Sequence, residues 1–328
     1  MKPLRTTEIR GNWATLLLPI RPDQSIDYDL LGDEISHFGT AGVNGVYSNG
    51  TAGEFYTQTE SEFDQVNQIL AGACERLHIP FQIGVSQMSP QLSLDRLRRA
   101  RAWEPSGFQV ILPDWFPPTM EDIHRFLDVM EGSADPIPLI VYNPPHAKRR
   151  LIPAEWVEIV ERHPGVAGIK VAGGDAVWYE AMRPVLDKVS VFIPGHTLAT
   201  GLSRGAHGAY SNVACLSPAG AQRWYELCRT SLTEGLKLEE KIGGFFSREV
   251  MPLITTRKLP NMAADKALAV AGGWLPGLST RLRWPYESAT EAEAIRIGTE
   301  ARVGLPELFP QDSALTGKRG FIASTGPL

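Results

Sequence analysis

The chain has 328 residues, of which 43% are hydrophobic and 21% charged, a balance typical of a globular protein built as one large barrel with an appendage or as two ordinary domains. Its formal net charge of -5 gives no electrostatic support to nucleic-acid binding. No stretch reaches the roughly 18 uninterrupted apolar residues of a membrane span, so no membrane partner is expected.

From residue 12 to about residue 230, short apolar or β-branched runs alternate with longer amphipathic stretches. The short runs are, in chain order, WATLLLP, GVYSNG, FQIGVS, GFQVILP, LIVYNPP, GIKVAGG, VFIPG and GAYSN. Apolar residues recur at intervals near 3.6, the period of a helix, in stretches such as ESEFDQVNQILAGACERL and EDIHRFLDVMEG. Eight such units in about 220 residues predict an α/β fold, a closed (β/α)8 TIM barrel with parallel strands.

The main alternative is an open, doubly wound sheet, but no G-x-G-x-x-G follows the first strand, where WATLLLP continues into IRPDQ. Beyond the barrel, helices are expected over 234–250, 263–272 and 289–303. We therefore predict a barrel with the active site over 1–230 and a C-terminal helical domain over 231–328. Its end, QDSALTGKRGFIASTGPL, is expected to be an extended tail.

The reacting groups of such a barrel lie at the carboxyl ends of its strands, so the residues that end or follow each predicted strand are the candidates for the active site. The candidates are Gly50, Thr51, Ala52, Gly53 and Glu54 after the second strand, Trp115 after the fourth, Tyr142 and Asn143 at the fifth, Lys170 at the sixth, Gly195 and His196 after the seventh, and Tyr210, Ser211 and Asn212 at the eighth. Trp115 and Tyr210 suggest an apolar or stacking surface for substrate, although both are equally compatible with ordinary packing.

Lys170 ends the apolar run GVAGIKVAG, with no carboxylate before Asp175. A lysine seldom points into a core without a functional reason. In a barrel lumen, desolvation would lower its pKa and leave some free amine, which can attack a ketone and form a Schiff base. The alternative is a lysine whose head reaches solvent at the strand end, and the pattern alone weighs the two equally.

Two further segments point to the same chemistry. The glycines of SNGTAGEF predict backbone N–H groups that converge on an anion such as a carboxylate, although an ordinary tight turn has a similar composition. Glu54 is interpreted as structural, accepting hydrogen bonds from this loop. In LIVYNPP, Tyr142 either exchanges a proton with substrate or is a core aromatic whose hydroxyl bonds to the backbone.

Together and in this order, GTAGE at 50–54, YNPP at 142–145 and GIK at 168–170 resemble the dihydrodipicolinate synthase / N-acetylneuraminate lyase family, whose pattern is G-T/S-T-G-E, Y-N-x-P, G-I-K. The resemblance implies a barrel with a C-terminal three-helix domain and a class I aldolase mechanism. Lys170 would form the imine, Tyr142 would shuttle the proton, and the GTAGE loop, which holds Thr51 as the third predicted catalytic residue, would bind the 2-oxo carboxylate. It also implies a homo-oligomer, a dimer or a tetramer.

The chain departs from the family pattern at three places. Ala52 replaces the second hydroxyl residue of the loop. Asp114 and Trp115 stand where dihydrodipicolinate synthases have two tyrosines, and an indole cannot relay a proton. The arginine that holds the second substrate's carboxylate in those enzymes aligns with about Ala147, and the basic residues that flank it, His146, Lys148 and Arg149, are the alternatives for its role. We therefore expect poor dihydrodipicolinate synthesis.

The function expected is an aldolase or dehydratase acting on a 2-oxo acid such as pyruvate or a 2-keto-3-deoxy sugar acid. The alternatives are a catalytically silent 2-oxo acid binder and a true dihydrodipicolinate synthase. A metal-dependent aldolase is not expected, because the seven histidines form no cluster in the sequence, and no metal or cofactor is predicted. A cytoplasmic location is expected, because the cysteines are few and unpaired and the opening MKPLRTTEIRGNW lacks an apolar core.

Overall fold

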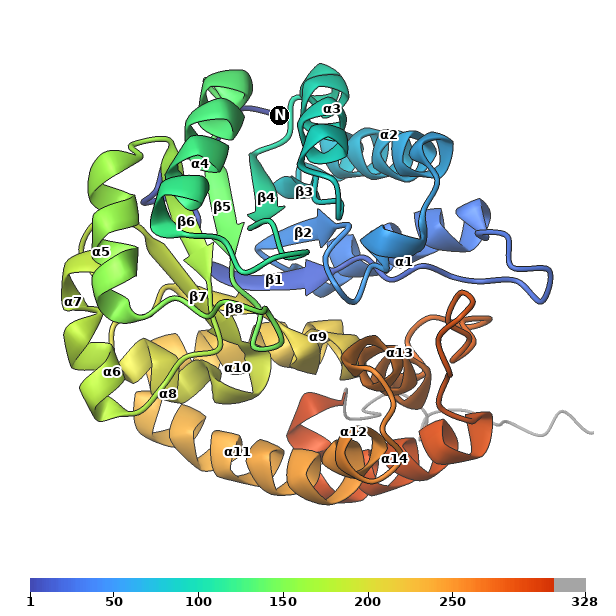
Figure 1. Cartoon of the computed structure of the whole chain (residues 1–328). Helices are drawn as coiled ribbons and strands as arrows, with labels where there is room; N and C mark the ends of the chain where they lie inside the picture. Colours follow the sequence, from blue (N-terminus) through green and yellow to red (C-terminus); the bar gives the residue numbers. More distant parts are fainter. Residues whose placement is uncertain (310–328) are drawn as a thin grey trace, which may run out of the picture.

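In the computed structural model, which describes residues 1–309, eight parallel strands form a closed barrel in which each strand pairs with the next and β1 pairs with β8 (Figure 1). The strands are β1 Gly11–Thr15, β2 Gly45–Ser48, β3 Phe81–Gly84, β4 Gly107–Ile111, β5 Leu139–Tyr142, β6 Val166–Lys170, β7 Ser190–Pro194 and β8 Gly208–Tyr210. The predicted TIM barrel is confirmed, and each of the eight apolar runs overlaps one strand. The predicted tail lies outside the described residues.

Helices separate the strands and cover the outside of the barrel. They are α1 Tyr28–Ala41, α2 Glu60–Leu77, α3 Pro90–Ala100, α4 Met120–Ala134, α5 Pro153–Arg162, α6 Ala176–Ala181, α7 Arg183–Leu186, α8 Leu198–Ser203, α9 Asn212–Leu216 and α10 Pro218–Thr230. Three short 3-10 helices accompany them: η1 Phe55–Thr57, η2 Arg101–Trp103 and η3 Gly195–Thr197. Side-chain caps start several of these helices: Thr59 and Thr119 each form a capping box with the acidic residue three positions on.

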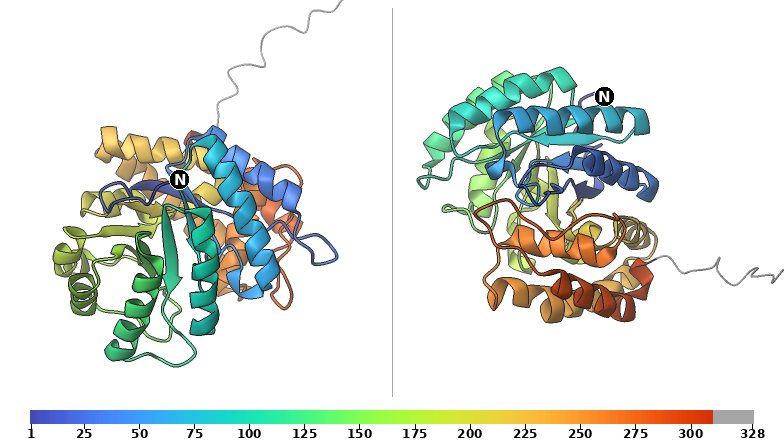
Figure 2. Two further views of the ribbon diagram at one scale, coloured as in Figure 1. Left: turned by 90° about the horizontal axis from the view of Figure 1, so that it is seen from above. Right: turned by 90° about the vertical axis from the view of Figure 1, so that its right-hand side faces the viewer.

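The described part of the segment after residue 230 consists of helices joined by turns and irregular loops, with no strand. It contains α11 Leu232–Phe245, the π-helical η4 Phe246–Val250, α12 Met251–Thr255, α13 Asn261–Gly272, α14 Glu291–Gly304 and the short η5 Pro306–Leu308. In the right-hand view of Figure 2, α13 and α14, coloured orange to red, lie across the barrel from α2 and α3. Helix α13 packs against α9, α12 and α14. The three helices expected from the sequence are therefore present, while a domain boundary at residue 230 stays a prediction.

Aromatic rings fill the lumen of the barrel below its carboxyl end. Trp13, Tyr47, Phe192 and Tyr210 belong to one buried cluster and contact each other edge to face or tilted. Gly45 makes room for this packing, because a Cβ atom there would lie 2.5 Å from the Trp13 ring. A filled lumen leaves space for ligands only at the strand ends. Within residues 1–309, each helix is too short or too polar to cross a lipid bilayer.

Candidate active site

Lys170, Tyr142 and Thr51 meet at the carboxyl end of the barrel. Lys170 and Tyr142 are the last residues of β6 and β5 and face each other in the strand register, so both side chains point the same way. Thr51 follows β2. All three line one cavity of about 90 Å³, together with Thr15, Tyr47, Ala52, Tyr210, Ser211, Asn212, Cys215, Asn261 and Asp265.

The Lys170 amine lies within a cage of three tyrosines. Its Nζ is 4.1 Å from the centre of the Tyr142 ring, 4.9 Å from that of Tyr47 and 5.1 Å from that of Tyr210. The amine donates a hydrogen bond of 3.3 Å to the Tyr47 hydroxyl. Burial lowers the pKa of Lys170 to about 8, against the opposing effect of the Asp265 carboxylate. About a tenth of the amine is then unprotonated at pH 7, far more than at an ordinary lysine.

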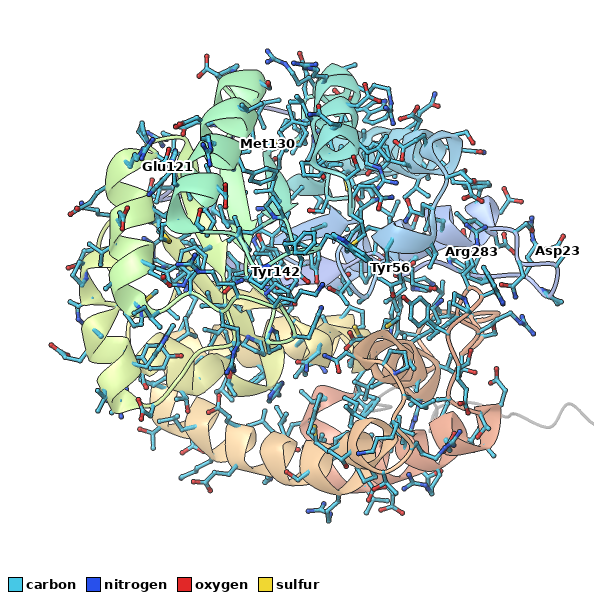
Figure 3. All side chains as sticks on the ribbon, viewed as in Figure 1. Asp23, Tyr56, Glu121, Met130, Tyr142 and Arg283 are labelled. Carbon is cyan, nitrogen blue, oxygen red and sulfur yellow. The ribbon has the colours of Figure 1, made fainter. Side chains whose placement is uncertain are left out.

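Tyr142 is held as a neutral phenol beside the amine. Burial raises its pKa to about 12, and the adjacent Thr51 hydroxyl partly opposes this rise. Thr51 Oγ1 is buried and makes no hydrogen bond of good geometry with any residue of the described chain. An unbonded buried hydroxyl beside a phenol can accept or donate a hydrogen bond when a ligand enters. Figure 3 shows Tyr142 on the side of the barrel that faces the C-terminal helices.

In the glycine-rich loop after β2, some residues line the cavity and others allow close packing against the strand ends. Ala52 lines the cavity, whereas Gly50 and Gly53 do not. A Cβ atom at Gly50 would lie 2.6 Å from the Tyr47 ring, and one at Gly53 would lie 3.0 Å from backbone atoms of Asn49 and Leu16. Both glycines therefore allow the loop to lie close against the strand ends, which sets the position of Thr51.

Glu54 is structural, as expected, but its hydrogen-bond donors are not those of its own loop. Its carboxylate accepts from the Lys266 amine at 2.5 Å and from the Arg283 backbone N–H at 2.9 Å. The side chains of Glu54 and Lys266 are both fully buried. This ion pair joins the loop after β2 to α13, on which Lys266 lies, and fixes the C-terminal helices against the active-site loop.

Two further residues predicted to bind substrate, Trp115 and Gly195, do not line this cavity. The Trp115 side chain is 67% exposed, and its ring packs against the Lys148 amine. Gly195 is buried, where a Cβ atom would lie 2.5 Å from Ser211 Oγ. Of the two aromatic residues predicted to form a stacking surface, only Tyr210 lines this cavity, and its contact with substrate stays a prediction. His196 lines a second cavity of about 550 Å³, which shares Lys170 and Tyr142 with the first.

A third cavity, of about 1190 Å³, opens beside Thr51 and is lined largely by aromatic and apolar side chains. Tyr56 and Arg283 are among its lining residues (Figure 3). The Arg283 guanidinium is already paired with both oxygens of Glu62 at 2.7 Å and with the backbone of Gln24. It therefore has little capacity left to hold a substrate carboxylate.

Sequence reasoning missed Tyr47 and Asp265. Tyr47 lies inside the run GVYSNG rather than after it, so the strand-end rule passed over it. Asp265 lies on α13, far along the chain from every motif. The sequence feature that could have indicated Asp265 is the adjacent pair of charges in NMAADKALAVAGG, a segment that is otherwise largely apolar. Such a helix has no polar face on which charged residues would lie in solvent. Within residues 1–309, no three His, Cys, Asp or Glu side chains are grouped so as to hold a metal ion.

Comparison with known proteins relates this chain to one family. The sequence model of the Dihydrodipicolinate synthetase family matches residues 8–281. The chain is 26% identical over 222 residues to a 4-hydroxy-tetrahydrodipicolinate synthase of Gluconacetobacter diazotrophicus, covering 66% of this chain and 73% of the relative. It is 29% identical over 210 residues to an N-acetylneuraminate lyase of Rhizobium meliloti, covering 62% and 67%.

Solved structures share the fold at low sequence identity. YagE from Escherichia coli K12, a prophage protein of the dihydrodipicolinic acid synthase family in complex with pyruvate, superposes with a TM-score of 0.79 at 18% identity, over 90% of this chain and 98% of that chain. The wild-type sialic acid aldolase of Ruminococcus gnavus gives a TM-score of 0.77 at 16% identity, over 92% and 100%.

Proposed function

Because this chain belongs to the dihydrodipicolinate synthetase family, and is thus a class I lyase or aldolase, we propose that it acts on a 2-oxo acid through a Schiff base on Lys170. The observation that carries this proposal is the position of the Lys170 amine. It is enclosed by Tyr47, Tyr142 and Tyr210, and burial lowers its pKa to about 8. Few other environments supply a free lysine amine near neutral pH.

The surrounding groups suit the steps that this chemistry needs. The free amine attacks the C2 ketone, and the resulting carbinolamine loses water to give the imine. Tyr142, a neutral phenol, donates the proton that the departing hydroxyl requires and recovers one through Thr51. We propose that the loop around Ala52 receives the 2-oxo carboxylate. The protonated imine then draws electrons from C3, which supports both carbon–carbon cleavage and dehydration.

The test is reductive trapping of 2-oxo acids across pH. With sodium cyanoborohydride, pyruvate or a longer 2-oxo acid should add one substrate-derived mass per chain, read by intact mass spectrometry. Because only the unprotonated amine is nucleophilic, the trapping rate should rise about tenfold per pH unit below 8 and level off above it. A rate that still rises toward pH 10, or no trapping of any 2-oxo acid, would contradict the proposal.

A second expectation concerns the choice of aldehyde. Condensation of pyruvate with aspartate semialdehyde should be slow, because Trp115 is turned outward and no arginine lines the cavities around Lys170 in the described chain. Arg149, which flanks the aligned position, is paired with Glu155. The measurement is product formation by the purified protein with both substrates. Efficient dihydrodipicolinate formation would contradict this expectation and would indicate that this chain shares the activity for which the 4-hydroxy-tetrahydrodipicolinate synthases are named. Assembly as a dimer or tetramer stays a prediction.

A further inference from the structure

Asp265 belongs to the same cavity as Lys170 although it comes from outside the barrel. It lies on α13 and lines both the 90 Å³ cavity and the adjoining cavity of about 550 Å³, as Lys170 and Tyr142 also do. Its neighbour Lys266 anchors α13 to the active-site loop through Glu54. The carboxylate is therefore held at the junction of the two cavities by a rigid element.

Few groups around Lys170 can accept a proton at neutral pH. Burial raises the pKa of Tyr142 to about 12 and raises those of Tyr47 and Tyr210 further, so all three are neutral phenols. Burial also keeps the Cys215 thiol protonated, since its pKa is raised well above the ordinary value. Lys170 itself is consumed when it forms the imine.

Asp265 differs from all of these groups. Burial raises its pKa, but only to about 6, because the Lys170 ammonium favours the carboxylate. The carboxylate is thus largely ionised at pH 7, both in the resting site and beside a protonated imine. No hydrogen-bond donor among the described residues holds it, and it lines open space rather than packed side chains. It is a base available to a ligand.

We propose that Asp265 is the general base that takes the proton from the C4 hydroxyl of a 4-hydroxy-2-oxo acid during cleavage of the C3–C4 bond. This inference rests on the function proposed above and deepens it. The small cavity accommodates the 2-oxo end bound to Lys170, and the remainder of the substrate extends past Asp265 into the larger cavity. This arrangement brings C4 to the carboxylate.

Cleavage of the C3–C4 bond begins at the hydroxyl group on C4. Asp265 takes the proton of O4, the O–H electron pair forms the C4=O bond, and the aldehyde separates as C3–C4 breaks. The electron pair of that bond becomes the C2=C3 bond of an enamine, which neutralises the imine nitrogen. Asp265 then returns its proton to C3, and water hydrolyses the imine to release pyruvate and the Lys170 amine. Each atom and proton of the substrate is recovered in the two products and the regenerated site.

The test separates imine formation from bond cleavage in Asp265→Asn, which keeps the side-chain volume but removes the base. Cleavage of 2-keto-3-deoxygluconate, or of whichever member of a panel of 4-hydroxy-2-oxo acids the wild type cleaves fastest, should fall by about 10² to 10⁴ when followed as pyruvate release. Reductive trapping of pyruvate at pH 7 should be equal or faster, because the carboxylate that raises the pKa of Lys170 is gone. Asp33→Asn, an exposed change on α1, is the charge-matched control and should alter neither rate.

The outcomes distinguish this inference from the proposed function. Unchanged cleavage in Asp265→Asn, or a wild type that traps pyruvate but cleaves no member of the panel, overturns the role of Asp265 alone. A wild type that traps nothing overturns the Schiff base itself. If Asp265→Asn loses trapping as well as cleavage, the deciding measurement is whether added formate restores cleavage by Asp265→Ala. Recovery of cleavage supports a carboxylate base, and no recovery overturns it.

Discussion

Lys170→Ala is expected to abolish reductive trapping and to lower turnover by about 10⁴ to 10⁶, the range spanned by removal of single members of a nucleophilic catalytic triad. Without the amine no imine forms, and the three tyrosines that enclose it are neutral phenols that cannot replace it. The fold should survive. The amine donates one hydrogen bond, to Tyr47, and Asp265 can take up a proton once its cationic neighbour is lost, since its pKa is already about 6.

The measurement pairs intact mass after trapping with circular dichroism and thermal unfolding. Peptide mapping of the trapped wild type should place the adduct on Lys170. Lys188→Ala is the matched control, because Lys188 is an exposed lysine paired with Glu161 on the surface and should trap like wild type. Trapping by Lys170→Ala at the wild-type rate would exclude Lys170 as the nucleophile and favour the interpretation of a binding protein that does not turn over.

Lys266→Met is expected to lower the free energy of unfolding by about 3 to 5 kcal/mol, the usual cost of leaving one partner of a buried ion pair uncompensated. Glu54 and Lys266 are both fully buried, and the amine also donates a hydrogen bond of 2.7 Å to the Arg281 backbone carbonyl. The variant leaves the Glu54 carboxylate with the Arg283 N–H but without a cation. Denaturant unfolding of both proteins measures the difference.

The double variant Glu54→Gln/Lys266→Met tests whether the loss comes from the unpaired charge. It removes both charges and keeps an oxygen able to accept the Arg283 N–H, so it should recover a large part of the stability, as neutral replacements of buried pairs often do. Arg296→Met, which breaks an ion pair with Glu249 in which the arginine side chain is 51% exposed, is the surface control and should cost no more than about 1 kcal/mol. A Lys266→Met variant as stable as wild type would show that the pair does not hold α13 in place.

Local patterns in the sequence predicted the barrel and part of its site. Alternation of apolar runs with amphipathic stretches depends on hydrogen bonding and burial within each element, so it is visible without a structure. The carboxyl-end rule then placed Thr51, Tyr142 and Lys170 in one site, because the ends of neighbouring parallel strands meet. Trp115 follows a strand as well, but its side chain turns outward to Lys148. The conformation of that loop sets this direction, and the spacing of apolar residues in the sequence does not predict it.

The sequence by itself determined the fold class, because the alternation of strands and helices is local, and it singled out Lys170 as the candidate nucleophile once the three motifs were read together. Only the tertiary structure decided that the amine is buried among three tyrosines, and that α13 brings Asp265 to it. The pKa of a buried group depends on every charge and apolar surface around it. The lowered pKa of Lys170 and the raised pKa of Asp265 therefore come from packing between segments far apart in the chain.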